Sequence, residues 1–396
     1  MKLFKSLLVA PATLGLLAPM TATANELNLK DVSGYSSSEE VQNISEFNPA
    51  EELAVTNSRV DGLEARLNNF EAGSFSETTT ASFSADMAIG AVDGATNEAL
   101  STAYGFQIDL NTSFTGEDSL DISIDAGNGG GAITEFDLNG AVVDSAANTT
   151  SDVLNVDGVM YTFPVGNATV FVGDNTDASA LFTTACAYGG PSNTLDDCGN
   201  VNAGVTGGGS AIGASYDFDN GFTAAVGYAG EGSSTAGLGT AEGLDVYGIN
   251  GAYSTDTYGV SVTFGHVEAT VASSGVLATD DQYMAVNGYW TPEGFPSISV
   301  GYEWGEDGSE VAAEDSLSSW FAGVEWAEVG PGTLGVAVGT KTPTTEDGEE
   351  ELMYEAYYSY DLNDGMTITP LVFIKEVAAA NSDDETGVMV KTSFSF

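Results

Sequence analysis

Carboxylates are the side chains of this chain with the greatest capacity for chemistry. The 396 residues include 58 Asp and Glu against 8 Lys and Arg, and no Lys or Arg occurs between Arg66 and Lys341. Such an acidic surface repels phosphate backbones, which excludes nucleic acid as a partner. Two interpretations of the acidity stay open: charge that keeps loops solvated in a saline habitat, and a field that attracts cations.

Residue patterns typical of catalysis do not occur in the sequence. The single histidine, His266, lies on the apolar face of a predicted strand and suits an interface position better than a metal ligand or a general base. The acids of Asp174–Asp177 and Asp383–Asp384 lack the spacing of a calcium loop, so we interpret them as solvated loop residues. We therefore predict a protein that is not an enzyme, with no cofactor and no metal.

Many carboxylates alternate with apolar residues, which is a strand pattern. In one such strand Val300, Tyr302 and Trp304 share a face, and Glu303 lies on the other. A carboxylate that faces lipid is costly, whereas one that faces a wet lumen is solvated. Seven acids placed in this way are candidate pore-lining residues: Asp86, Asp109, Asp121, Asp125, Glu303, Glu325 and Glu355.

About sixteen strands follow from Phe75 onward, separated by alternately short and long connections. Short turns on one rim and long loops on the other are typical of a transmembrane barrel. Ile133–Leu138 could be a further strand, but an odd count would place the chain ends on opposite sides of the membrane, so we assign 128–152 to an outer loop. The predicted fold is all-β, a transmembrane antiparallel β-barrel over 74–396. A secreted acidic β-rich adhesin or surface structural protein is the alternative.

The last stretch, 386–396, is the predicted closing strand. Its period-two alternation runs to the final residue, and its apolar face ends on Phe394 and Phe396. The apolar face suits lipid and the opposite polar face suits a lumen. An amphipathic edge strand of a soluble sandwich is the other interpretation.

Residues 1–24 have a charged start, a short apolar core and the cleavage motif Ala22-Thr23-Ala24, which together predict a removable secretory signal peptide. Export leads to an oxidising compartment. There Cys186 and Cys198, which share one loop-like stretch, are expected to form a local disulfide, with two free thiols as the alternative.

An irregular periplasmic lead over 25–50 precedes a predicted coiled-coil helix over 51–73, which Gly73 ends. Its apolar positions follow 3-4-3-4-3 spacing. One such helix is marginal alone, so a bundle of identical helices, three by preference, would bury the seam. The alternative is a single helix packed on its own barrel. The seam residues are Leu53, Thr56, Val60, Leu63, Leu67 and Phe70.

Several segments resemble the cyanobacterial Som-type outer-membrane porins, which are similar to the carbohydrate-selective porin family. They are Val41–Phe47, Val60–Leu67 with Phe75–Thr80, Ser113–Asp118 and Tyr161–Gly166. The resemblance implies a homotrimeric porin in the outer membrane, surrounded by its lipid, with the helix in the periplasm. It also implies that the barrel assembly machinery reads the C-terminal strand.

The chain departs from this family pattern in one place. Family members usually carry an S-layer-homology domain between the lead and the coil, whereas here Phe47 runs almost directly to Leu53. Attachment to peptidoglycan by that route is therefore doubtful.

The function that these observations imply is passive diffusion of small hydrophilic solutes and ions. Resemblance to sixteen-stranded porins implies that the third outer loop folds into the lumen, and this loop holds both cysteines and no basic residue. Because the central chain cannot build a basic cluster, we predict a cation-selective pore. The predicted constriction-loop acids are Asp174, Asp177, Asp196 and Asp197.

A carbohydrate-selective porin is the alternative function. Sugar-selective channels need aromatic side chains along the path. Here most aromatics fall on outward faces, with Phe321 and Tyr357 as exceptions.

Overall fold

The structure is a computed structural model that describes one of two units of the chain. The units are Met1–Ser74 and Phe75–Phe396, and every described residue belongs to the second. The expected signal peptide, the 25–50 lead and the 51–73 helix therefore lie outside the described residues. Within the described part, no helix has the length and apolar character needed to cross a membrane. The described residues are 78–95, 98–129, 133, 135, 136, 138, 152–205, 209–234, 237–268, 280–307, 315–346, 348–377 and 383–396.

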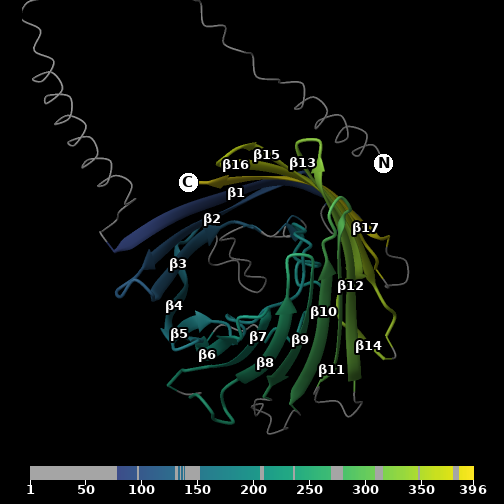
Figure 1. Cartoon of the computed structure of the whole chain (residues 1–396). Helices are drawn as coiled ribbons and strands as arrows, with labels where there is room; N and C mark the ends of the chain where they lie inside the picture. The colour runs from purple at the N-terminus through teal and green to yellow at the C-terminus, as the bar shows by residue number, and fades with distance from the viewer. Residues whose placement is uncertain are drawn as a thin grey trace, which may run out of the picture. The chain divides into compact units, whose positions relative to one another are not determined.

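The second unit is a closed antiparallel sheet (Figure 1). Each strand of nine or more residues pairs with the strands of that length before and after it in sequence, and the first strand also pairs with the last. Closure satisfies the backbone polar groups that an open edge would leave exposed to lipid. The strands are β1 (Thr79–Asp93), β2 (Ser101–Thr112), β3 (Ser119–Gly127), β4 (Asn155–Val165), β5 (Ala168–Thr176), β6 (Gly209–Asp217), β7 (Phe222–Gly230), β8 (Asp245–Ser254), β9 (Tyr258–Val267), β10 (Asp281–Trp290), β11 (Ser297–Asp307), β12 (Asp315–Val329), β13 (Gly332–Thr340), β14 (Thr344–Thr345), β15 (Leu352–Asn363), β16 (Met366–Lys375) and β17 (Glu385–Ser395).

The barrel wall has sixteen strand positions. β14 has only two residues and pairs with Leu317 and Ser318 of β12, beyond the stretch of β12 that pairs with β13, so it continues the line of β13. The predicted sixteen-stranded barrel is therefore confirmed. Residues 133–138 add no barrel strand in their described part, where Phe136 forms an isolated bridge with Ser192.

Backbone pairing between β1 and the C-terminal strand continues to the last residue of the chain. Phe83 and Phe396 exchange two backbone hydrogen bonds of 3.0 Å, and their rings stack with centroids 5.7 Å apart. Ten further residue pairs continue this register from Ser84–Ser395 to Asp93–Thr386. The predicted closing strand thus pairs along its full length.

Alternation decides which side chains face outward. On β11, Val300, Tyr302 and Trp304 are 40–50% exposed, whereas Ser299 and Glu303 on the other face are at most 1% exposed. An apolar outer surface of this kind suits lipid.

Two of the sequence segments singled out above meet at one rim of the barrel. Asp118, at the end of the β2–β3 turn, accepts hydrogen bonds from Thr115 N (2.7 Å), Ser113 Oγ (2.9 Å) and Tyr161 Oη (2.7 Å). Burial raises the pKa of Asp118, but these hydrogen bonds outweigh it and hold the pKa well below its usual range. The turn and β4 are therefore tied together through one carboxylate.

Candidate functional site

The connection between β5 and β6, called here the β5–β6 loop (177–208, described over 177–205), lies inside the barrel (Figure 1). Its residues Ala178, Ala185, Leu195 and Ala203 are at most 2% exposed. A loop this deeply buried needs partners for its backbone polar groups. The inner face of the wall supplies them.

One arm of the loop, residues 183–189, crosses the strands in an extended path. Every second backbone N–H along it donates to a wall side chain, which is the spacing expected of an extended segment. The bonds are Thr183 N to Asn250 Oδ1 (3.0 Å, β8), Ala185 N to Ser261 Oγ (2.9 Å, β9), Ala187 N to Ser299 Oγ (2.8 Å, β11) and Gly189 N to Glu325 Oε2 (3.1 Å, β12).

The later part of the β5–β6 loop, from Cys198 to Ala203, is the returning arm, and one buried carboxylate anchors it. Glu303 is fully buried and accepts hydrogen bonds from Asn202 N (2.8 Å), Asn202 Nδ2 (2.8 Å) and Ala203 N (2.7 Å). A disulfide between Cys186 and Cys198 joins this arm to the first. Charge-assisted hydrogen bonds of this kind are the stronger class, so Glu303 is a principal anchor of the loop.

Inward-facing glycines let the loop lie directly on the wall. A Cβ atom on Gly301 would run into the carbonyl oxygen of Cys198, and one on Gly227 would run into that of Ala178. Glycine is the residue used where two backbones approach this closely. These glycines therefore form part of the surface on which the loop packs.

The inner face of the wall is not the same surface as the open channel. Asp86, Glu303 and Glu355 face inward but are at most 4% exposed, so their predicted pore-lining position is wrong. The loop explains this for two of them, because Glu303 binds its backbone and Glu355 accepts a 2.6 Å hydrogen bond from Tyr188 Oη. Alternation along a strand reports a side chain's face but not what covers it.

Glu325 is half-buried beside the same loop. It accepts hydrogen bonds from Gly189 N and from Tyr357 Oη (2.5 Å). Its carboxylate therefore serves first as an anchor for the loop.

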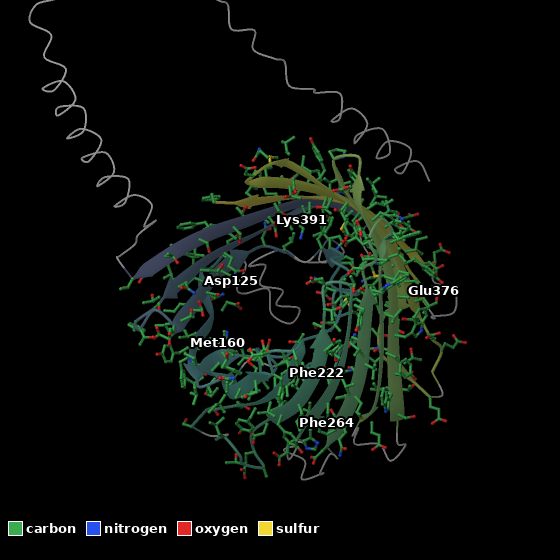
Figure 2. All side chains as sticks on the ribbon, in the orientation of Figure 1. Asp125, Met160, Phe222, Phe264, Glu376 and Lys391 are labelled. Atoms are coloured by element: carbon green, nitrogen blue, oxygen red, sulfur yellow. A yellow bond between two sulfur atoms is a disulfide. The ribbon has the colours of Figure 1, made fainter. Side chains whose placement is uncertain are left out.

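The acids of β2 and β3 remain partly exposed on the inner face. Asp109 accepts hydrogen bonds from Gln107 Nε2 (2.7 Å) and Ser123 Oγ (2.8 Å), and Asp121 accepts one from Ser119 Oγ (2.8 Å). β3 lies eight strand positions from β11 around a wall of sixteen, on the side opposite the Glu303 anchor. Figure 2 shows Asp125 on the inside of the ring of strands.

The predicted constriction-loop acids divide into two groups. Asp196 and Asp197 are exposed on the β5–β6 loop, and Asp177 begins that loop with its side chain partly buried. Asp174 lies within β5 and accepts a 3.0 Å hydrogen bond from Ser210 Oγ, so its predicted place in the loop is wrong. The strand extends to Thr176, three residues further than its pattern indicated.

Asp197 has an altered acidity. Although its side chain reaches solvent, the protein around it and then the nearby Glu303 charge raise its pKa to about 6. Asp197 can therefore change charge within the neutral to mildly acidic range.

The described residues contain no group of three or more His, Cys, Asp or Glu side chains placed to hold a metal ion. His266 lies 3.4 Å from Asp280 and packs against the ring of Tyr247, which is 44% exposed on the outer face. His266 therefore lies on the outer face of the wall, beside Tyr247.

Sequence reasoning missed an apolar core inside the barrel. Phe321, Met353, Phe373 and Met389 point inward from β12, β15, β16 and β17 and are at most 2% exposed. They pack with residues of the β5–β6 loop and with Phe136 and Leu138 of the connection between β3 and β4. Large apolar side chains at inward positions of nearby strands are the signal that could have revealed it. They show that this half of the lumen is filled with protein.

Replacement of Glu303 by Ala should loosen the β5–β6 loop. The change leaves the buried backbone N–H of Ala203 and the partly buried backbone N–H of Asn202 without an acceptor, and the buried group alone costs about 1–3 kcal/mol. We expect larger and noisier single-channel conductance in planar bilayers. The control is Glu306→Ala on the same strand, whose side chain is exposed at the rim. Conductance equal to that of the wild type in both variants would show that Glu303 does not restrain the loop.

Comparisons with known proteins agree with this geometry. The family model described as Gram-negative porin matches residues 71–383. An uncharacterized Nostoc protein, alr4550, is 31% identical over 163 residues, which are 38% of this chain and 27% of that protein. The match thus spans about a quarter of that relative's length.

Solved structures share the fold at low sequence identity. Pseudomonas putida OprB has a TM-score of 0.58 at 12% identity, covering 81% of this chain and 94% of its own. The anion-selective porin of Comamonas acidovorans has a TM-score of 0.56 at 13% identity, covering 81% and 99%. The trimer form of Vibrio cholerae OmpT has a TM-score of 0.53 at 11% identity, covering 81% and 100%.

The family model covers most of the chain, and the barrel, its inserted loop and its apolar outer surface are those of a membrane channel. The protein therefore belongs to the Gram-negative porin family, and it is an outer-membrane porin.

Proposed function

We propose that this porin gives passive diffusion of small hydrophilic solutes and ions and that it selects cations. The observation that carries the proposal is the charge of the partly exposed inner surface. Asp109, Asp121 and Asp125 lie on the wall, and Asp196 and Asp197 lie on the inserted loop. A passage bordered by carboxylates concentrates cations and repels anions.

The sugar-selective alternative has less support. Phe321 and Tyr357, the lumen-side aromatics that favoured it, are 2% and 4% exposed and pack against Tyr188 of the loop. Buried rings cannot stack with a passing sugar. A general diffusion pore fits these contacts better than a path of sugar-stacking platforms.

We also propose that the chain assembles as a homotrimer of the cyanobacterial Som type. The support is the predicted heptad seam, the sequence segments noted above, the Nostoc relative and the trimer form of Vibrio cholerae OmpT. Chemical cross-linking in detergent should trap three subunits, and deletion of 51–73 should reduce that yield by roughly half or more. A native mass equal to one chain would contradict the trimer.

Cation selectivity should appear as a reversal potential under a KCl gradient. We expect potassium to be favoured at about 0.01 M salt and the preference to shrink near 1 M, where the Debye length falls from about 30 Å to about 3 Å. Asp121→Asn and the double variant Asp196→Asn/Asp197→Asn should each lower the permeability ratio roughly twofold or more. Glu117→Gln, an exposed acid in a turn, is the control. A reversal potential at low salt that is zero, or that has the sign of anion selectivity, would contradict the proposal.

Selectivity should also fall as the pH drops through about 6. Because the pKa of Asp197 is raised to about 6, its carboxylate is charged above that pH and neutral below it. The cation preference should therefore be larger at pH 7.5 than at pH 5, and Asp197→Asn should remove this step. Reversal potentials measured at both pH values test it. An identical pH response in the variant would assign the titration to other groups.

A further inference from the structure

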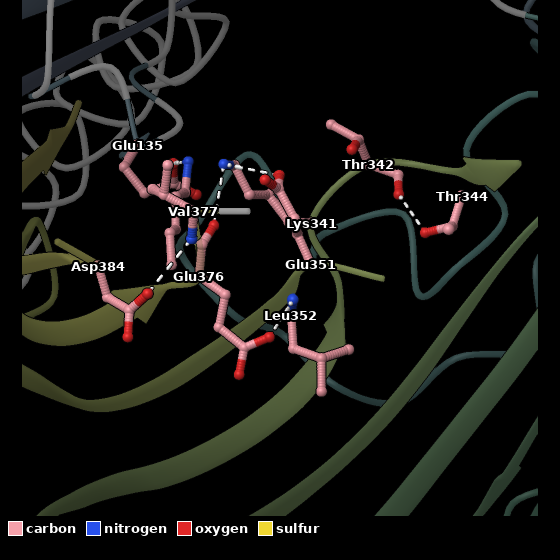
Figure 3. Close-up of polar contacts among 10 residues, drawn as sticks. Glu135, Lys341, Thr342, Thr344, Glu351, Leu352, Glu376, Val377 and Asp384 are labelled. Carbon is pink, nitrogen blue, oxygen red and sulfur yellow. Dashed lines mark hydrogen bonds and ion pairs between the residues drawn. The ribbon is translucent and has the colours of Figure 1, made fainter. Parts of the chain in front are cut away.

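Three lysines lie in the described part of the chain, Lys341, Lys375 and Lys391. Lys341 directly follows β13, and its Nζ is 3.0 Å from Glu351 Oε2 and 3.1 Å from the backbone oxygen of Glu376 (Figure 3). Lys375 and Lys391 belong to β16 and β17 and share the inward face of those strands. Figure 2 shows Lys391 inside the ring of strands.

Both inward lysines are contacted by the connection between β3 and β4. Lys375 forms an ion pair with Glu135, and its side chain is 16% exposed. Lys391 Nζ lies 5.9 Å from the centre of the Phe136 ring, within cation–π range. Two adjacent residues of one inserted segment therefore cover two basic groups of the wall.

The segment is held in place by the β5–β6 loop. Asn193 N donates to the Glu135 backbone oxygen (2.9 Å), Thr194 N donates to Glu135 Oε1 (3.2 Å), and Phe136 bridges to Ser192. Glu135 is 5% exposed and Phe136 is 1% exposed. One carboxylate thus joins both inserted loops to the β16 wall, with Oε1 on the loop and Oε2 on Lys375.

The Lys375 charge matters because it projects into a barrel where the partly exposed charged groups named above, Lys391 apart, are acids. An ammonium without a partner at this position would lower the negative potential that passing ions meet. Paired with Glu135, it forms a nearly neutral unit whose field decays quickly with distance. Removal of one member of a buried pair restores the full charge of the other.

We infer that Glu135 is a specificity-determining residue of the channel. By holding Lys375 in a buried ion pair, it keeps that positive charge out of the field along the permeation path. This inference rests on the proposed cation selectivity.

The experiment measures reversal potentials of Glu135→Gln, Lys375→Gln and the double variant in the full-length porin. The amide oxygen that Glu135→Gln introduces can still accept from Thr194 N, so this change removes charge while keeping that contact. We expect Glu135→Gln to lower the potassium-over-chloride permeability ratio by roughly twofold to fivefold at 0.01 M salt, with little effect at 1 M. Lys375→Gln should raise the ratio. The double variant should return close to the wild-type value.

The double variant separates charge from loop displacement. If Glu135→Gln acts only by loosening the loops, the double variant will stay as altered as the single one, which would overturn the inference. A cation-selective wild type with an unchanged Glu135→Gln variant would also overturn it, while leaving the proposed function intact. A wild type without cation preference would overturn the proposed function itself.

Discussion

Backbone hydrogen bonding inside a membrane is the constraint on which the rest of this structure depends. Lipid offers no partners for N–H and C=O groups, so the sheet must close on itself. The pairing of β1 with β17 along its whole length achieves this closure. Closure in turn creates an interior that is too wide for side chains from sixteen strands to fill.

The same constraint governs the material that fills the interior. The β5–β6 loop is buried, and its backbone groups find partners in Asn, Ser and Glu side chains of the wall. Strand side chains thus do for the loop what neighbouring strands do for each other. The inward glycines and the buried aromatics of β12–β17 form the rest of the surface on which the loop packs.

Carboxylates have two physical roles within one barrel. Where they are buried, as at Glu303 and Glu355, they accept hydrogen bonds and fix the loop in place. Where they remain partly exposed, as at Asp109 and Asp121, their side chains reach the lumen. The buried group positions the loop, and the exposed group lies on the partly exposed inner surface. Glu135 combines the two roles, because it binds a loop N–H and a lysine ammonium at once.

The sequence by itself determined the strands, their faces and the sign of the charge. Alternation such as that of Tyr302 and Trp304 against Glu303 is a local property, because side chains on a strand point to opposite faces with period two. Only the tertiary structure decided which inward acids meet the channel, since that depends on loops distant in sequence. Glu303 and Asp109 have the same local pattern, yet a returning loop buries one and leaves the other partly exposed. The contact of Glu135 with Lys375 likewise joins residues 240 positions apart, and no local periodicity carries that information.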